Sequence, residues 1–96
     1  MGAYRVLLVD DEEEIRQGIC RKMNWEALGF VLAGEAANGM EALEVAEQTC
    51  PDVVLSDIKM PYMDGLELGR QLHRMMPAVK LVFFSGFDDF EYARQA

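Results

Sequence analysis

The chain has 96 residues, of which 51% are hydrophobic, and its 17 acidic and 9 basic residues give a formal net charge of −8. This length predicts one domain covering residues 1–96, with enough apolar residues for a packed core, and excludes a disordered chain. The excess of acidic residues argues against binding to nucleic-acid phosphates or to an anionic membrane. The sequence shows neither a signal peptide nor a membrane span, so the protein is expected to be cytoplasmic.

Short apolar runs alternate with segments of helical periodicity. The runs are Tyr4–Val9, Phe30–Ala33, Val53–Leu55 and Leu81–Phe84. Their unbroken hydrophobicity predicts parallel strands that are covered on both faces. Between them, apolar residues recur every three or four positions, which predicts helices that pack on the sheet. These stripes are Ile15, Ile19 and Met23; Leu43, Ala46 and Cys50; and Leu68, Leu72, Met75 and Met76. The alternation predicts a doubly wound α/β fold with right-handed crossovers.

A repeated pattern marks the predicted helix starts. In each case a residue that can cap a helix is followed three positions later by Glu, a pair that can satisfy free amides in the first turn. The pairs are Asp11 and Glu14, Asn38 and Glu41, Asp64 and Glu67, and Asp88 and Glu91. They predict four helices, one after each strand.

Two cysteines, Cys20 and Cys50, are thirty positions apart and form no C-x-x-C motif. Their spacing does not exclude a disulfide. Two buried, reduced thiols are the favoured interpretation for a protein of the cytoplasm.

Acidic and hydroxyl side chains stand at the predicted strand ends. The first strand is followed by Asp10 and Asp11, the third by Asp57, and the fourth by Ser85. In open parallel sheets the functional site lies at the carboxyl ends of the strands, so the three carboxylates are expected to converge. Crowded carboxylates raise one another's pKa unless a cation lies between them, and Mg²⁺ is the cation that best suits such oxygen ligands. Taken singly, Asp11 could instead cap a helix and Asp10 occupy a turn.

Asp57 precedes a loop that contains Pro61 and Gly65. A carboxylate beside a bound Mg²⁺ can act as a nucleophile toward phosphorus and form an acyl phosphate. The hydroxyl of Ser85 could donate a hydrogen bond to that phosphoryl group, or it could satisfy only the local backbone.

Three motifs in this order resemble those of bacterial response-regulator receiver domains. They are Val6–Glu12 (VLLVDDE), Pro51–Gly65 (PDVVLSDIKMPYMDG) and Phe84–Gly86 (FSG). The resemblance covers the whole chain and implies a flavodoxin-like fold with strand order 2-1-3-4. It implies that Asp57 accepts a phosphoryl group from a sensor histidine kinase, with Ser85 as the switch hydroxyl. It also implies an Mg²⁺ site, whose ligands would be Asp10 (largely through water), Asp11, Asp57 and the main-chain carbonyl of Lys59.

The chain departs from the family pattern at its C-terminal end. Receiver domains have a fifth strand and a fifth helix, and the missing part would carry a Lys that contacts the phosphoryl group. Lys80 cannot replace it, because it lies at the wrong end of the fourth strand. A fourth strand left at the sheet edge invites pairing with another chain. We therefore expect either a fragment of a longer regulator or self-association by dimerisation or strand exchange.

The sequence is compatible with three functions. The favoured one is a signalling switch that catalyses only its own phosphorylation and dephosphorylation. A phosphohydrolase of the haloacid dehalogenase type is disfavoured, because its nucleophile would lie in an Asp-x-Asp motif on the first strand. A receiver-like module that binds partners without being phosphorylated is the main alternative. The segments Phe87–Arg94 and Trp25–Phe30 resemble regulators whose output is an AraC-type helix-turn-helix, which implies that the parent protein regulates transcription.

Overall fold

The computed structural model describes residues 3–57, 63 and 65–84. Strands and helices alternate along this part of the chain. They are β1 (Tyr4–Val9), α1 (Glu13–Lys22), β2 (Phe30–Ala36), α2 (Gly39–Thr49), β3 (Val53–Asp57), α3 (Gly65–Met75) and β4 (Lys80–Phe84). The fourth predicted helix lies outside the described residues. Among the helices that are described, none has the length and apolar character needed to cross a membrane.

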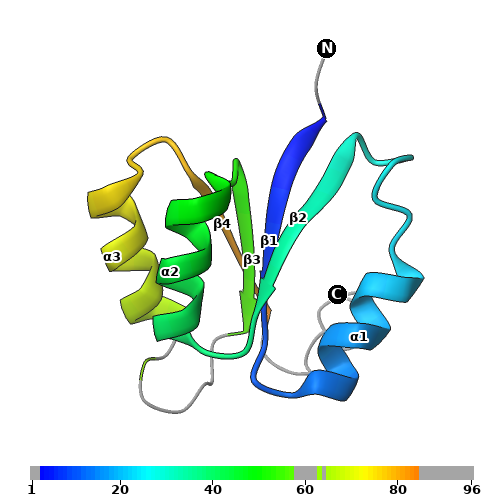
Figure 1. The fold of residues 1–96 in the computed structure, drawn as a ribbon, viewed down its shortest axis with the longest axis horizontal. Coiled ribbons are helices and arrows are strands. Elements are labelled where there is room, and N and C mark those ends of the chain that lie inside the picture. Colours follow the sequence, from blue (N-terminus) through cyan, green and yellow to red (C-terminus); the bar gives the residue numbers. More distant parts are fainter. Residues whose placement is uncertain (1–2, 58–62, 64, 85–96) are drawn as a thin grey trace.

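The four strands form one parallel sheet in the order β2-β1-β3-β4, which confirms the predicted fold and strand order. Helices α2 and α3 cover one face of this sheet, and α1 lies on the opposite face (Figure 1). The pairing of β1 with β2 is irregular at one point, where Val6 is opposite Leu32 but Leu7 is opposite Gly34. Ala33 is therefore an extra residue, a bulge in β2.

The core lies between the sheet and helices α2 and α3. Its fully buried side chains come from both layers: Leu7, Val9, Val54, Ala42, Ala46, Leu68 and Leu72. On the other face of the sheet, Val6 and Leu8 are buried, whereas Val82 of β4 is 48% exposed. Helix α1 contributes no fully buried residue, and its predicted stripe, represented by Ile15 and Ile19, is only half-buried.

One of the predicted helix caps is confirmed and another is wrong. The side chain of Asn38 accepts a hydrogen bond of 2.8 Å from the Glu41 amide at the start of α2. The prediction for α1 is wrong, because this helix begins at Glu13, two residues beyond Asp11. The cause is local: Asp10 Oδ1 accepts from the Glu12 amide at 2.9 Å, so the chain forms a turn there before the helix begins. The caps predicted at Asp64 and Asp88 lie outside the described residues.

The predicted burial of both thiols is not observed. Cys20 is half-buried and Cys50 is exposed, and neither forms a disulfide. Cys50 follows the last residue of α2 and adopts a left-handed conformation, with φ of 48°. This change of backbone direction removes Cys50 from the apolar stripe of the helix.

Candidate functional site

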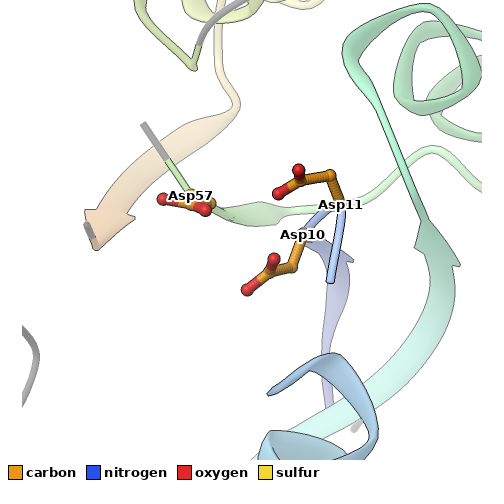
Figure 2. A group of neighbouring side chains, drawn as sticks. All are labelled: Asp10, Asp11 and Asp57. Atoms are coloured by element: carbon orange, nitrogen blue, oxygen red, sulfur yellow. The ribbon is translucent and has the colours of Figure 1, made fainter. Parts of the chain in front are cut away.

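Three carboxylates meet at the carboxyl edge of the sheet. Asp10 and Asp11 follow β1, and Asp57 is the last residue of β3. Because Val9 of β1 is paired with Ser56 of β3, the two strands end at the same level. One carboxylate oxygen from each of the three aspartates lies within 4.8 Å of the others (Figure 2). The structure thus brings together the three acidic residues that the sequence predicted to converge.

Asp10 is the least accessible member of this acidic cluster (Asp10, Asp11 and Asp57). Its exposed fraction is 0%, and its Oδ2 atom is buried without a hydrogen-bond partner among the described residues. Leaving a buried polar atom without a partner is costly, by about 1–3 kcal/mol. Three carboxylates with one unsatisfied buried oxygen form a donor set that suits a hard divalent cation, and the site therefore fits Mg²⁺.

The surroundings of Asp10 favour its neutral form. Burial is the main cause that raises the pKa of Asp10 from 3.8 to about 6. The negative charges of Asp57 and Asp11 raise it as well, while the hydrogen bond from the Glu12 amide lowers it. A bound cation would favour the ionised carboxylate and so oppose this rise in the pKa of Asp10.

Asp57 and Asp11 differ in their contact with solvent. Asp57 is buried, with 6% of its surface exposed, and the neighbouring Ser56 hydroxyl donates to its main-chain oxygen at 2.9 Å. Asp11 is exposed, so it lies on the solvent side of the acidic cluster.

Replacement of Asp10 by Asn is expected to stabilise the protein in the absence of divalent cations. The carboxyl pKa is 3.8 when unperturbed and about 6 in the fold, so folding favours the protonated form. This contribution is fully present below pH 3.8 and is lost as the pH rises through 6. At pH 7.5 with a chelator, Asp10→Asn should be more stable than wild type by on the order of 2 kcal/mol.

Urea unfolding of both proteins at pH 4 and pH 7.5 measures this difference. Near pH 4 the gain should largely disappear, since wild-type Asp10 is then mostly protonated in the fold. A stability difference that is the same at both pH values would show that the ionisation of Asp10 is not its source.

Two predicted site residues, Lys59 and Ser85, lie outside the described residues. The placement of Lys80 is confirmed, because it begins β4, at the end of the strand opposite to the acidic cluster. Sequence reasoning missed one set of contacts beside the cluster, between Arg16 and Gln17 of α1 and Glu35 of β2. The sequence offered no signal for these contacts, because the predicted strand ended at Ala33 and did not include Glu35.

Comparisons with known proteins agree with this fold. Residues 6–96 match the family described as "Response regulator receiver domain". The chain is 45% identical over 93 residues to an uncharacterized transcriptional regulatory protein, YesN of Bacillus subtilis, covering 97% of the chain but only 25% of YesN.

Two solved structures are also similar. One is the receiver domain of AraT, a response regulator from Geobacillus stearothermophilus, with 37% identity and a TM-score of 0.82. The other is a two-component transcriptional regulator AraC from Clostridium phytofermentans, with 38% identity and a TM-score of 0.82. Each alignment covers 98% of the present chain and 73% of the other. The chain belongs to the response-regulator receiver domain family.

Proposed function

We propose that this domain is a phosphorylation-dependent signalling switch whose phosphoryl acceptor is Asp57. The observation that carries the proposal is the acidic cluster, in which a buried carboxylate at a strand end is joined by two further carboxylates. In a member of the receiver family, this arrangement supports transfer of a phosphoryl group from the phosphohistidine of a sensor kinase. The domain catalyses only its own phosphorylation and dephosphorylation.

The transfer exchanges one bond to phosphorus for another. An oxygen of the Asp57 carboxylate attacks the phosphorus, a P–O bond forms, the P–N bond to the donor histidine breaks, and the imidazole leaves with the bonding electron pair. Hydrolysis of the acyl phosphate by water then returns the free carboxylate and inorganic phosphate.

The other members of the cluster would help to hold a cation that offsets negative charge during this transfer. Asp10, Asp11 and Asp57, with the main-chain carbonyl of Lys59, would hold Mg²⁺. When bound, the ion supplies positive charge to the phosphoryl oxygens and to the crowded carboxylates. The hydroxyl of Ser85 is proposed to donate a hydrogen bond to the phosphoryl group and so to report its presence.

In the parent protein the switch is proposed to control an output domain that binds DNA. YesN and the Clostridium phytofermentans regulator are both named as transcriptional regulators, the second of them as AraC. The present chain spans only a quarter of the length of YesN. We place the protein in the cytoplasm. The domain itself binds a sensor kinase and another copy of the chain rather than nucleic acid or membrane, in keeping with its charge of −8.

Intact-mass analysis after incubation with acetyl phosphate tests the acceptor function. We expect one phosphoryl adduct that forms with Mg²⁺ and is absent when the metal is removed by a chelator. Circular dichroism of the same sample shows that the protein is folded. A folded protein that gains no adduct with Mg²⁺ present would overturn the proposal and support a receiver-like module that only binds partners.

A further inference from the structure

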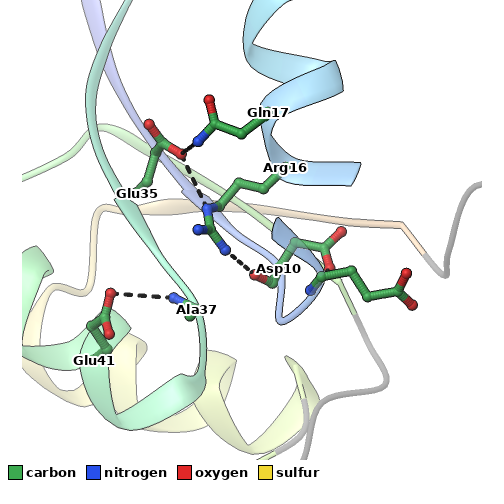
Figure 3. Close-up of polar contacts among 7 residues, drawn as sticks. Asp10, Arg16, Gln17, Glu35, Ala37 and Glu41 are labelled. Carbon is green, nitrogen blue, oxygen red and sulfur yellow. Dashed lines mark hydrogen bonds and ion pairs between the residues drawn. The ribbon is translucent and has the colours of Figure 1, made fainter. Parts of the chain in front are cut away.

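The side chain of Arg16 links three elements beside the acidic cluster (Figure 3). From α1 it extends toward the end of β1, where its Nη1 donates to the main-chain oxygen of Asp10 at 2.7 Å. Its Nε donates at 3.1 Å to Oε1 of Glu35 in β2. The same Glu35 oxygen accepts a bond of 3.1 Å from the Gln17 amide. The Arg16 side chain is only 13% exposed, whereas that of its partner Glu35 is 34% exposed.

The bond to Asp10 acts on the peptide unit that connects two members of the acidic cluster. The carbonyl of Asp10 and the amide of Asp11 belong to one planar group, so orienting this carbonyl orients the whole plane. On its other side, Asp10 donates its amide to the Ala36 oxygen of β2 at 3.1 Å. Asp10 is therefore held on both sides, by the sheet and by Arg16. The directions in which the Asp10 and Asp11 side chains leave the backbone depend on this double attachment.

Arginine suits this position because of its shape. The guanidinium group is planar and rigid, and it presents several donors in fixed directions. One side chain can therefore bond the Glu35 carboxylate and the Asp10 carbonyl together. The ammonium group of a lysine is a single point on a flexible stem and does not reproduce this fork.

We propose that Arg16 is a positioning residue for the cation site, because it fixes the peptide between Asp10 and Asp11 against β2. This inference rests on the proposed function, in which the acidic cluster binds Mg²⁺. Arg16 has no place among the proposed ligands and acts on the ion only through the backbone that carries them.

Charge and geometry predict opposite effects for the loss of Arg16. If the guanidinium acted only as a positive charge near the site, its removal would strengthen the binding of a cation. If it orients the ligands, its removal would weaken binding, since partners that orient metal ligands typically contribute 10- to 100-fold to affinity. The sign of the change therefore distinguishes the two roles.

The test is calorimetric titration of the chain with MgCl₂ alone, at constant ionic strength. We expect Arg16→Ala to bind Mg²⁺ about tenfold more weakly than wild type, at the lower end of that range. Arg16→Lys, which keeps the charge, should not restore the affinity. Arg21→Ala is the matched control, because it removes an exposed arginine from the same helix and should leave the affinity unchanged.

Two further measurements keep the interpretation clear. Urea unfolding of each variant shows that the titrated protein is folded, and if Arg16→Ala does not fold, Arg16→Lys decides the question. The amide resonance of Asp11, recorded without metal, should shift in both Arg16 variants and stay in place in Arg21→Ala. Wild-type affinity in the folded Arg16 variants, or a stronger one, would overturn the positioning role alone. Absence of Mg²⁺ binding by wild type would overturn the proposed function and this inference with it.

Discussion

Replacement of Asp57 by Asn is expected to remove the phosphoryl adduct completely. The amide has nearly the shape of the carboxylate but lacks the negatively charged oxygen that attacks phosphorus. Asp57 ends β3, and its side chain is buried beside Asp10 and Asp11. Intact-mass analysis after incubation with acetyl phosphate and Mg²⁺ measures the loss directly.

Asp52→Asn provides the matched control for this experiment. Asp52 precedes the same strand at its opposite end, is exposed, and accepts a hydrogen bond of 2.8 Å from the Arg5 amide. Asparagine can still accept this bond through its side-chain oxygen, so the control should be phosphorylated like wild type. An adduct that persists in Asp57→Asn would show that another residue is the acceptor.

Replacement of Leu68 by Ala is expected to destabilise the domain by about 2–5 kcal/mol. Leu68 is fully buried on α3 and belongs to the core between the sheet and the helices. The substitution removes apolar contacts and leaves a cavity that the surrounding side chains fill only in part. Such a loss is a large fraction of the stability of a small domain. Urea unfolding monitored by circular dichroism measures it.

Leu66→Ala controls for the chemical change itself. Leu66 lies on the same helix two positions earlier, but it is 53% exposed. Its truncation should change the free energy of unfolding by no more than about 0.5 kcal/mol. Similar losses for both variants would contradict the packing of α3 described above.

The fold and the acidic cluster were predictable because they depend on simple periodicities. The apolar run Val6–Val9 can be buried on both faces only in a covered sheet, and the stripe of Leu68 and Leu72 fits a helix that packs on one. Once the sheet is parallel, the residues that follow neighbouring strands must meet at one edge. Asp10, Asp11 and Asp57 therefore converge by topology.

Other features depend on contacts that no periodicity encodes. The start of α1 differs from the predicted one because the Asp10 side chain accepts a hydrogen bond from the Glu12 amide. Strand β2 extends three residues beyond its predicted end at Ala33, although Glu35 is charged. The charge is tolerated there because Arg16 and Gln17 bond it, and both partners come from a different element.

The bulge at Ala33 determines which residue Arg16 can reach. Side chains alternate between the two faces of a strand, so one extra residue reverses the alternation for every residue that follows it. With the bulge, Glu35 is paired with Leu8 and lies on the face of α1, while Ala36 is paired with Val9 and is buried in the core. If the same sequence paired regularly, with Ala33 opposite Leu7, Glu35 would be opposite Val9 on the core face and out of reach of Arg16. In this sequence the bulge therefore allows Ala36 to be buried in the core while Glu35 lies on the face of α1, where Arg16 bonds it.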